Sequence, residues 1–263
     1  RVSGPRGWLM TVVCLIPVLA GFGIPATVLV ILHFETGDPL FGRSFMQFAT
    51  NTLLVGGIAA GIACAGALWL AYAARLGDNW LQQAALRLAT LGYALPGTVL
   101  GVGLLLPLTS LDRSLATLME SAGWTPRLLL TGTAAALVLA YVARFMTVAF
   151  NSTQAGLLQV HPHVDDAARS LGAGPLQVLG RIHVPLVRPA LLSGLLLVFI
   201  DVVKELPATL ILRPFNFETL ATRVYRLASD ERLAEASTAA LVIVAVGLVP
   251  TVLLVVQGRR KQD

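Results

Sequence analysis

The sequence is poor in charge, in lysine and in cysteine. Only 13% of its 263 residues are charged, against about 25% in an ordinary soluble protein. In contrast, 56% of the residues are hydrophobic and the mean hydropathy is +0.77. A soluble domain of this composition has too few polar residues to cover its exterior. Collagen-like, disulfide-rich and disordered chains are excluded as well. We therefore expect an integral membrane protein.

Missing motifs exclude several chemical functions. The two lysines, Lys204 and Lys261, do not follow a glycine-rich phosphate loop, so the chain has no P-loop for ATP. The two cysteines, Cys14 and Cys64, lie in apolar stretches at a spacing that suits neither a metal site nor a redox pair. The sequence has no His-Glu-x-x-His motif and no nucleophile elbow. We predict that the chain is not an enzyme and holds no metal or cofactor of its own.

In place of such motifs, the sequence has long apolar runs. A bilayer core of about 30 Å needs about 20 helical residues to cross it. Six segments are long enough, which predicts an all-α integral membrane protein with six transmembrane helices, at 8–32, 51–74, 88–108, 128–149, 189–212 and 236–256. Small residues recur four apart at Gly57/Gly61 and Gly97/Gly101, a spacing that permits close helix crossings.

The basic residues indicate the orientation of these spans. The formal net charge is +5 and almost all of the positive residues are arginines, which we interpret as topology anchors rather than as a nucleic-acid surface. Six crossings place both termini on one side, together with the loop 150–188. This side carries more of the arginines, and the other side carries more of the acids. The positive-inside rule therefore predicts that both ends and the 150–188 loop are cytoplasmic.

Residues 161–189 lie between the fourth and fifth predicted spans and read HPHVDDAARSLGAGPLQVLGRIHVPLVRP. The first part has the signals of a short helix, with Asp165 and Asp166 in its first turn and Gly172 able to take the left-handed conformation at its end. A second short amphipathic helix is expected to follow and to stop at Pro185. These signals fit either an ordinary interfacial loop or a helix–turn–helix element that stands outside the membrane.

The same loop resembles the cytoplasmic signature of ABC importer permeases, in which Glu-Ala-Ala is followed at fixed spacing by Gly, Ile and Leu-Pro. The residues that match this signature are Asp166, Ala167, Ala168, Gly172, Ile182 and Pro185. Asp166 stands in place of Glu and Val184 in place of Leu, and both changes keep the charge or the apolar character. The resemblance implies a type I importer permease fold in which this loop is a coupling helix that docks on an ATPase subunit.

The resemblance also implies the partners of the chain. They are a dimer of ATPase subunits that carries ATP and Mg, a second permease half, a periplasmic or extracellular solute-binding protein, and the lipid of the bacterial inner membrane. No nucleic acid is expected. Two rival interpretations are an ion-coupled secondary transporter, with Asp201 and Glu205 in its ion site, and a membrane-embedded enzyme.

Further segments resemble the ferric-iron branch of these permeases: 92–97, 204–209, 212–214, 217–221 and 228–231. This implies ferric iron as the substrate, with thiamine, polyamines, sulfate and phosphonates as the alternatives handled by related permeases. It also implies that the chain is the C-terminal half of a fused permease. We expect an N-terminal span and outer loop at 1–45, a permease core at 46–257 with its coupling loop at 152–188, and a cytoplasmic tail at 258–263.

Charged residues within the fifth predicted span need partners. Asp201, Lys204 and Glu205 lie near its middle, where three unpaired charges would cost on the order of 9 kcal/mol in lipid. Asp201 can pair with Lys204 on one helix stripe, which leaves Glu205 in excess beside a carbonyl freed by Pro207. The cluster therefore either lines a wet cation pathway or forms a buried structural pair that sets the helix register.

Two other features have weaker signals. His161, His163 and His183 are predicted to be solvated loop histidines, because a hard ferric ion prefers oxygen ligands to imidazole. Residues 213–235 balance basic and acidic side chains around an apolar stripe, which predicts an amphipathic helix at the outer surface. That helix is either a docking edge for a solute-binding protein or an interfacial cover.

Overall fold

The protein is described here by a computed structural model that covers residues 4–77 and 79–259. Within these ranges it consists of helices and connecting loops, without a strand. The elements in chain order are α1 (Pro5–Val18), the π-helical turn η1 (Leu19–Gly23), α2 (Ile24–Glu35), α3 (Arg43–Leu76), α4 (Trp80–Leu91), the 3₁₀ turn η2 (Gly92–Ala94), α5 (Gly97–Ser121), α6 (Ala134–Leu158), α7 (His163–Ser170), α8 (Pro175–Val178), the π-helical turn η3 (Leu179–His183), α9 (Val184–Val203), α10 (Pro207–Leu212), α11 (Leu220–Ser229) and α12 (Leu233–Arg259). The predicted tail 258–263 lies outside the described residues from position 260 onward.

In the described part of the chain, six helical segments are long and apolar enough to cross a membrane, which confirms the predicted number of spans. They are Gly7–Glu35, Arg43–Leu76, Gly97–Ser121, Ala134–Leu158, Pro175–Val203 and Leu233–Val256. Each exceeds the length of about 20 residues that a bilayer requires. The chain is therefore an all-α, multi-pass membrane protein.

The bounds predicted for the third span were wrong. The apolar run 88–108 contains a break, because α4 ends at Leu91 and the long helix α5 begins only at Gly97, directly after Pro96. Gly92 marks this break, since a Cβ at that position would clash with the backbone carbonyl of Ala143 on α6. A hydropathy window does not register such a break, because the residues on both sides of it are apolar.

The fifth span also differs from its prediction. The helix does not stop at Pro185 but runs without interruption from Pro175 to Val203, and 207–212 forms the separate short helix α10. A proline lacks a backbone donor and crowds the carbonyl four residues before it. The π-helical turn η3 lies directly ahead of Pro185, and its wider winding accommodates the ring so that the helix continues.

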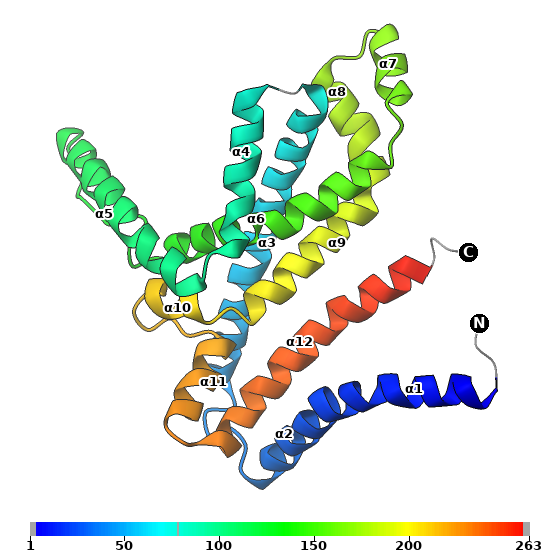
Figure 1. Ribbon diagram of the computed structural model, residues 1–263. Coiled ribbons are helices and arrows are strands. Elements are labelled where there is room, and N and C mark those ends of the chain that lie inside the picture. The colour runs from blue at the N-terminus through cyan, green and yellow to red at the C-terminus, as the bar shows by residue number, and fades with distance from the viewer. Residues whose placement is uncertain (1–3, 78, 260–263) are drawn as a thin grey trace.

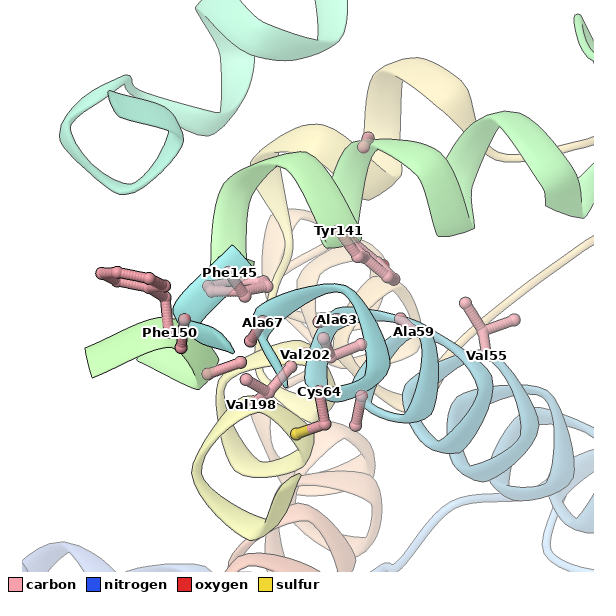
Figure 2. Packing of buried hydrophobic residues seen from close by; sticks show 14 of the residues in the cluster. Val55, Ala59, Ala63, Cys64, Ala67, Tyr141, Phe145, Phe150, Val198 and Val202 are labelled. Atoms are coloured by element: carbon pink, nitrogen blue, oxygen red, sulfur yellow. The ribbon is translucent and has the colours of Figure 1, made fainter. Parts of the chain in front are cut away.

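The core of the bundle lies where α3 packs against α6 and α9. The face of α3 in this contact is built from small side chains, and Ala59, Ala63 and Ala67 are fully buried (Figure 2). Larger residues fill the space opposite them, including Tyr141 on α6 and Val198 on α9 (Figure 2). Alanine on one helix allows the neighbouring backbones to approach closely, which is how membrane helices associate in the absence of a hydrophobic driving force.

Other elements lie at the edges of this core. In Figure 1, α5 points away from the bundle, and α7 and α11 lie at opposite ends of it. None of the first span, Gly7–Glu35, is buried by the described chain.

On α5, Gly97 and Gly101 face α10, where a Cβ would lie 3.1 Å from Pro207 and 3.2 Å from Ile211 respectively. The predicted close crossing is thus confirmed for this glycine pair.

Candidate functional site

The short helix α7 has well-formed ends. Its first turn contains the predicted acids Asp165 and Asp166, which complement the helix dipole. Gly172 has a φ of +80°, which confirms the predicted left-handed conformation. The N–H of Gly172 donates to the carbonyl of Arg169, and the N–H of Ala173 donates to that of Ala168. This pair of bonds is a Schellman motif, so α7 is a capped unit with a fixed end.

The residues that match the permease signature fall on both sides of α7 and on the helix that follows it. Asp166 and Ala167 are exposed, whereas Ala168 is buried against the bundle. Ile182 is half-buried in η3, and Pro185 is exposed at the start of α9. The exposed side of α7 thus faces outward, while the methyl group of Ala168 anchors the helix to the bundle. Leu171 at the C-cap is 88% exposed and adds an apolar side chain to the outward surface.

A partly buried acid–base cluster lies behind α7, and the sequence did not indicate it. Asp165 points toward the bundle, where its Oδ2 accepts a hydrogen bond from Nε of Arg75 at 2.7 Å and its Oδ1 accepts one from Nε2 of His183 at 2.5 Å. The prediction that His183 is solvated was wrong, because its side chain is fully buried. Arg75 and Asp165 are 90 positions apart, so no local spacing indicates their contact.

The cluster also sets the charge state of its carboxylate. Burial alone raises the pKa of Asp165, but hydrogen bonds from Arg75 and His183 and the attraction to these groups hold that pKa below its ordinary value. Asp165 is therefore ionised at neutral pH and accepts hydrogen bonds with both of its oxygens.

The charges predicted for the middle of the fifth span lie at its end instead. Asp201 is in the last turn of α9 and pairs with Lys204 at 2.9 Å, as the spacing predicts. Lys204 is 62% exposed, and α9 ends at Val203. Glu205 therefore does not share a helix stripe with the other two, and the predicted common stripe was wrong.

Glu205 is not in excess either, because Arg144 on α6 lies beside it. Nε of Arg144 is 3.4 Å from Oε2 of Glu205, while Nη1 donates to the carbonyl of Leu95 at 2.7 Å. The predicted net negative charge at this point was therefore wrong. The pair is a loose one, since Nε of Arg144 is buried and has no hydrogen-bond partner in the described chain.

Two helix breaks meet at this pair. Leu95 belongs to the break before α5, and Glu205 belongs to the break between α9 and α10. A Cβ on Gly97 would lie 2.5 Å from Oε1 of Glu205, so any larger residue at this position would force the carboxylate of Glu205 to shift. The hydroxyl of Thr209 on α10 donates to the backbone carbonyl of Glu205 and is hydrogen-bonded to the hydroxyl of Tyr141. Pro207 begins α10 at a position that needs no backbone donor.

Another charged pair, Arg223 with Asp38, lies at the end of the bundle away from α7 (Figure 1). Arg223 on α11 donates to Asp38 through Nε at 2.9 Å and through Nη2 at 2.6 Å, and both side chains are buried. Thr238 on α12 accepts from the backbone N–H of Asp38 and is hydrogen-bonded to His33. The amphipathic helix predicted within 213–235 is confirmed as α11, which packs on α12.

Other candidate chemistry is sparse. Among the described residues, no three His, Cys, Asp or Glu side chains form a group that could hold a metal ion. His161 and His163 are exposed, as predicted, and their rings lie 4.4 Å apart.

Comparison with known proteins relates this arrangement to a transport family. Residues 57–262 match the family described as "Binding-protein-dependent transport system inner membrane component". The fold is similar to that of a chain in the crystal structure of a bacterial alginate ABC transporter in complex with an alginate pentasaccharide-bound periplasmic protein. That likeness has a TM-score of 0.72 at 16% identity and covers 98% of this chain and 96% of the other.

Among curated proteins, the chain is 26% identical over 210 residues to the Fe(3+)-transport system permease protein FbpB 2 of Haemophilus influenzae, which covers 80% of this chain and 38% of that protein. It is 27% identical over 119 residues to the putative 2-aminoethylphosphonate transport system permease protein PhnV of Salmonella typhimurium, with 45% of each covered. The chain thus spans less than half the length of these relatives.

Proposed function

The chain belongs to the family of binding-protein-dependent transport system inner membrane components, the permeases of ABC importers, and from this premise we propose that it forms half of a translocation pathway powered by ATP. ATP and Mg are bound by a separate dimer of ATPase subunits. A second permease half, fused or separate, completes the pathway, and an external solute-binding protein delivers the substrate.

The observation that carries this proposal is the form of α7. The helix is capped at its end by Gly172 and stands at one extremity of the bundle (Figure 1). It turns Asp166, Ala167 and Leu171 outward, and these supply one charge and an apolar surface to a partner. A short rigid element of this kind can pass a rigid-body displacement from the partner to the spans. Ala168 is buried and holds α7 against the bundle, and we propose that Ile182 and Pro185 act in the helix that follows it.

The orientation follows from the same proposal. An ATPase that uses cytoplasmic ATP must reach α7, so α7 and both chain ends lie on the cytoplasmic side of the inner membrane. The α10–α11 region then faces outward, where a solute-binding protein arrives. The structure has six spans, the number that the positive-inside argument assumed, and an even number of crossings puts both chain ends on the same side.

For the substrate we propose ferric iron. The support is the Haemophilus influenzae relative, whose name describes Fe(3+) transport and which covers most of this chain. The phosphonate permease of Salmonella typhimurium covers less than half of it and supports phosphonate as the second candidate. Uptake of labelled ferric ion and of labelled 2-aminoethylphosphonate into vesicles that hold the complete transporter separates the two.

We propose further that the break at Glu205 is a moving part of the pathway rather than a permanent structural lock. The contact between Arg144 and Glu205 is loose, and it joins two helix breaks that a small displacement can separate. Asp201, Lys204 and Pro207 flank this break, and the exposed Lys204 gives it a polar surface. Because Arg144 balances the charge of Glu205, the closed pair offers no net negative charge to a cation. A cation can therefore bind Glu205 only after the two side chains part.

The direct test of the proposed function is crosslinking in intact cells. A cysteine at Leu171 lies on the outward surface of α7 and is expected to capture a P-loop ATPase. A matched cysteine at Phe215, which is fully exposed in the loop between α10 and α11 at the other end of the bundle, is expected not to capture it. Capture from neither position, or from both equally, would overturn the proposal.

A further inference from the structure

α7 is attached to the bundle at very few points. Ala168 is its only buried residue. Asp165 and Asp166 are adjacent, yet the side chain of Asp165 is 15% exposed and that of Asp166 is 66% exposed. The two acids therefore have different surroundings, one facing the bundle and the other facing away from it.

The bundle side of α7 meets two different spans through the one carboxylate of Asp165. One oxygen accepts from Arg75 in the last turn of α3, and the other accepts from His183 in η3, just before α9 begins. Because a carboxylate only accepts, the Nε2 of His183 carries the hydrogen in this contact. The carboxylate thus links α7 to the second and fifth spans at the same time.

Arg75 extends the link to a third span. Its Nη1 donates to the carbonyl of Leu157 at 2.7 Å, and its Nη2 donates to the carbonyl of Val160 at 2.8 Å. These carbonyls lie at the end of α6, where the chain leaves the bundle toward α7. A planar guanidinium with three engaged donors holds its partners in one geometry, which a lysine ammonium does not do.

The far end of the loop is fixed by Tyr72, one turn before Arg75 on α3. Its hydroxyl donates to the carbonyl of Pro175 at 2.8 Å, and its ring lies 5.4 Å from the ring of the fully buried His183. Both ends of the loop that carries α7 are therefore held by the last turns of α3.

From this geometry we infer that Asp165 is a positioning residue that joins α7, the end of α3 and the start of α9 into one rigid body. The inference rests on the proposed function of α7, and it assigns the transmission of movement to a residue outside the matching signature. A displacement imposed on α7 reaches α3 and α9 together through the hydrogen bonds of one carboxylate. Without them, α7 swings on its flanking loops and the displacement is lost.

The test measures how rigidly α7 is held in the complete transporter. With Cys14 and Cys64 replaced, spin labels at Ser170 on α7 and at Arg188 on α9, both exposed, report the distance between the two helices. We expect a narrow distance distribution in the parent protein. In Asp165→Asn it is expected to be about twofold wider, because the amide has one acceptor oxygen for two donors. Asp165→Glu, which keeps both acceptors, is expected to restore most of the narrow distribution.

Crosslinking from Leu171 to the ATPase separates this inference from the proposed function. Asp165→Asn is expected to keep the crosslink while ATP-driven uptake of ferric ion falls. Asp166→Asn, in contrast, is expected to weaken the crosslink and leave the distance distribution narrow.

A distance distribution that stays equally narrow in Asp165→Asn would overturn the inference. A parent protein that never crosslinks would overturn the proposed function instead. If Asp165→Asn does not assemble, Arg75→Lys gives the same readout, since it keeps the charge and loses the fork of donors.

Discussion

Two arginine–carboxylate pairs in this protein are built differently. At the α11 end, Arg223 and Asp38 share two short hydrogen bonds, and the carboxylate also accepts from the N–H of Leu40. At the helix breaks, Arg144 and Glu205 lie 3.4 Å apart and no hydrogen bond joins them through Nε. The Arg223–Asp38 pair, which we call the clamped pair, joins α11 to the loop after α2 at a corner of the bundle. The Arg144–Glu205 pair connects two helix breaks. One end of the bundle is thus joined by short hydrogen bonds, whereas the pair at the breaks lacks them, which supports the proposal that the breaks can separate.

The largest effect is expected from breaking the clamped pair. Arg223→Ala leaves the buried Asp38 without its partner, and removing one member of a buried pair costs about 3–5 kcal/mol. Thermal unfolding of the purified protein in detergent is expected to show this loss. Arg226→Ala, three residues further along α11, removes a half-exposed partner of Glu218 and is expected to cost less than about 1 kcal/mol. Equal losses of stability in the two variants would mean that the Arg223–Asp38 pair contributes no more than a half-exposed pair does.

A methyl group at the breaks is expected to have the next largest effect. Gly97→Ala forces Glu205 and Pro207 away from α5, and overpacking of this kind costs about 1–3 kcal/mol. Gly103→Ala on the same helix is the control, because it meets no neighbour within 4 Å among the described residues. The same thermal unfolding measurement applies. If both variants behave alike, the close approach at Gly97 does not exist in the membrane protein.

The loose pair itself is expected to contribute little stability. Glu205→Gln keeps the size of the side chain and removes its charge, and we expect a loss of about 1 kcal/mol, in the range of one ordinary hydrogen bond. Asp38→Asn is the matched change at the clamp and is expected to cost several times more. A loss for Glu205→Gln as large as that for Asp38→Asn would abolish the distinction between the two regions. Uptake that is unchanged in Glu205→Gln would favour a structural role for this residue.

The smallest effect is expected at Lys204. Its partner Asp201 is only partly exposed, but Lys204 itself is mostly exposed, and such ion pairs contribute about 0–1 kcal/mol. Lys204→Ala is therefore expected to unfold within a few degrees of the parent protein. Raised salt is expected to abolish even this small difference, because solvent ions screen exposed charges. A loss that persists at high salt would place Lys204 in a buried environment instead.

Much of the fold could be predicted because it depends on local patterns. Apolar runs of sufficient length give the number of spans, and acids followed by Gly172 give the helix α7 with its end. The break at Gly92 and the continuation of the helix through Pro185 could not be predicted, since both depend on neighbours. Gly92 faces a carbonyl of α6, and the π-helical turn that accommodates Pro185 leaves no mark in a hydropathy profile.

The candidate site was predictable only in part, for the same reason. The pairing of Asp201 with Lys204 follows from a spacing of three residues. Arg144 lies 61 positions before Glu205, and Asp38 lies 185 positions before Arg223, so these partners become apparent only once the helices are packed. Charges that looked like an unbalanced stripe in one helix are balanced by another helix.

Thiol labelling at two positions in the complete transporter shows whether movement imposed on α7 opens the breaks and leaves the corner closed. In a background without Cys14 and Cys64, Leu95→Cys reports on the breaks and Leu40→Cys reports on the corner, and both positions are exposed. We expect ATP to change the labelling rate at position 95 and to leave the rate at position 40 unchanged. If the rate at position 95 is the same with and without ATP, or if both rates change equally, α7 does not drive a selective opening of the breaks.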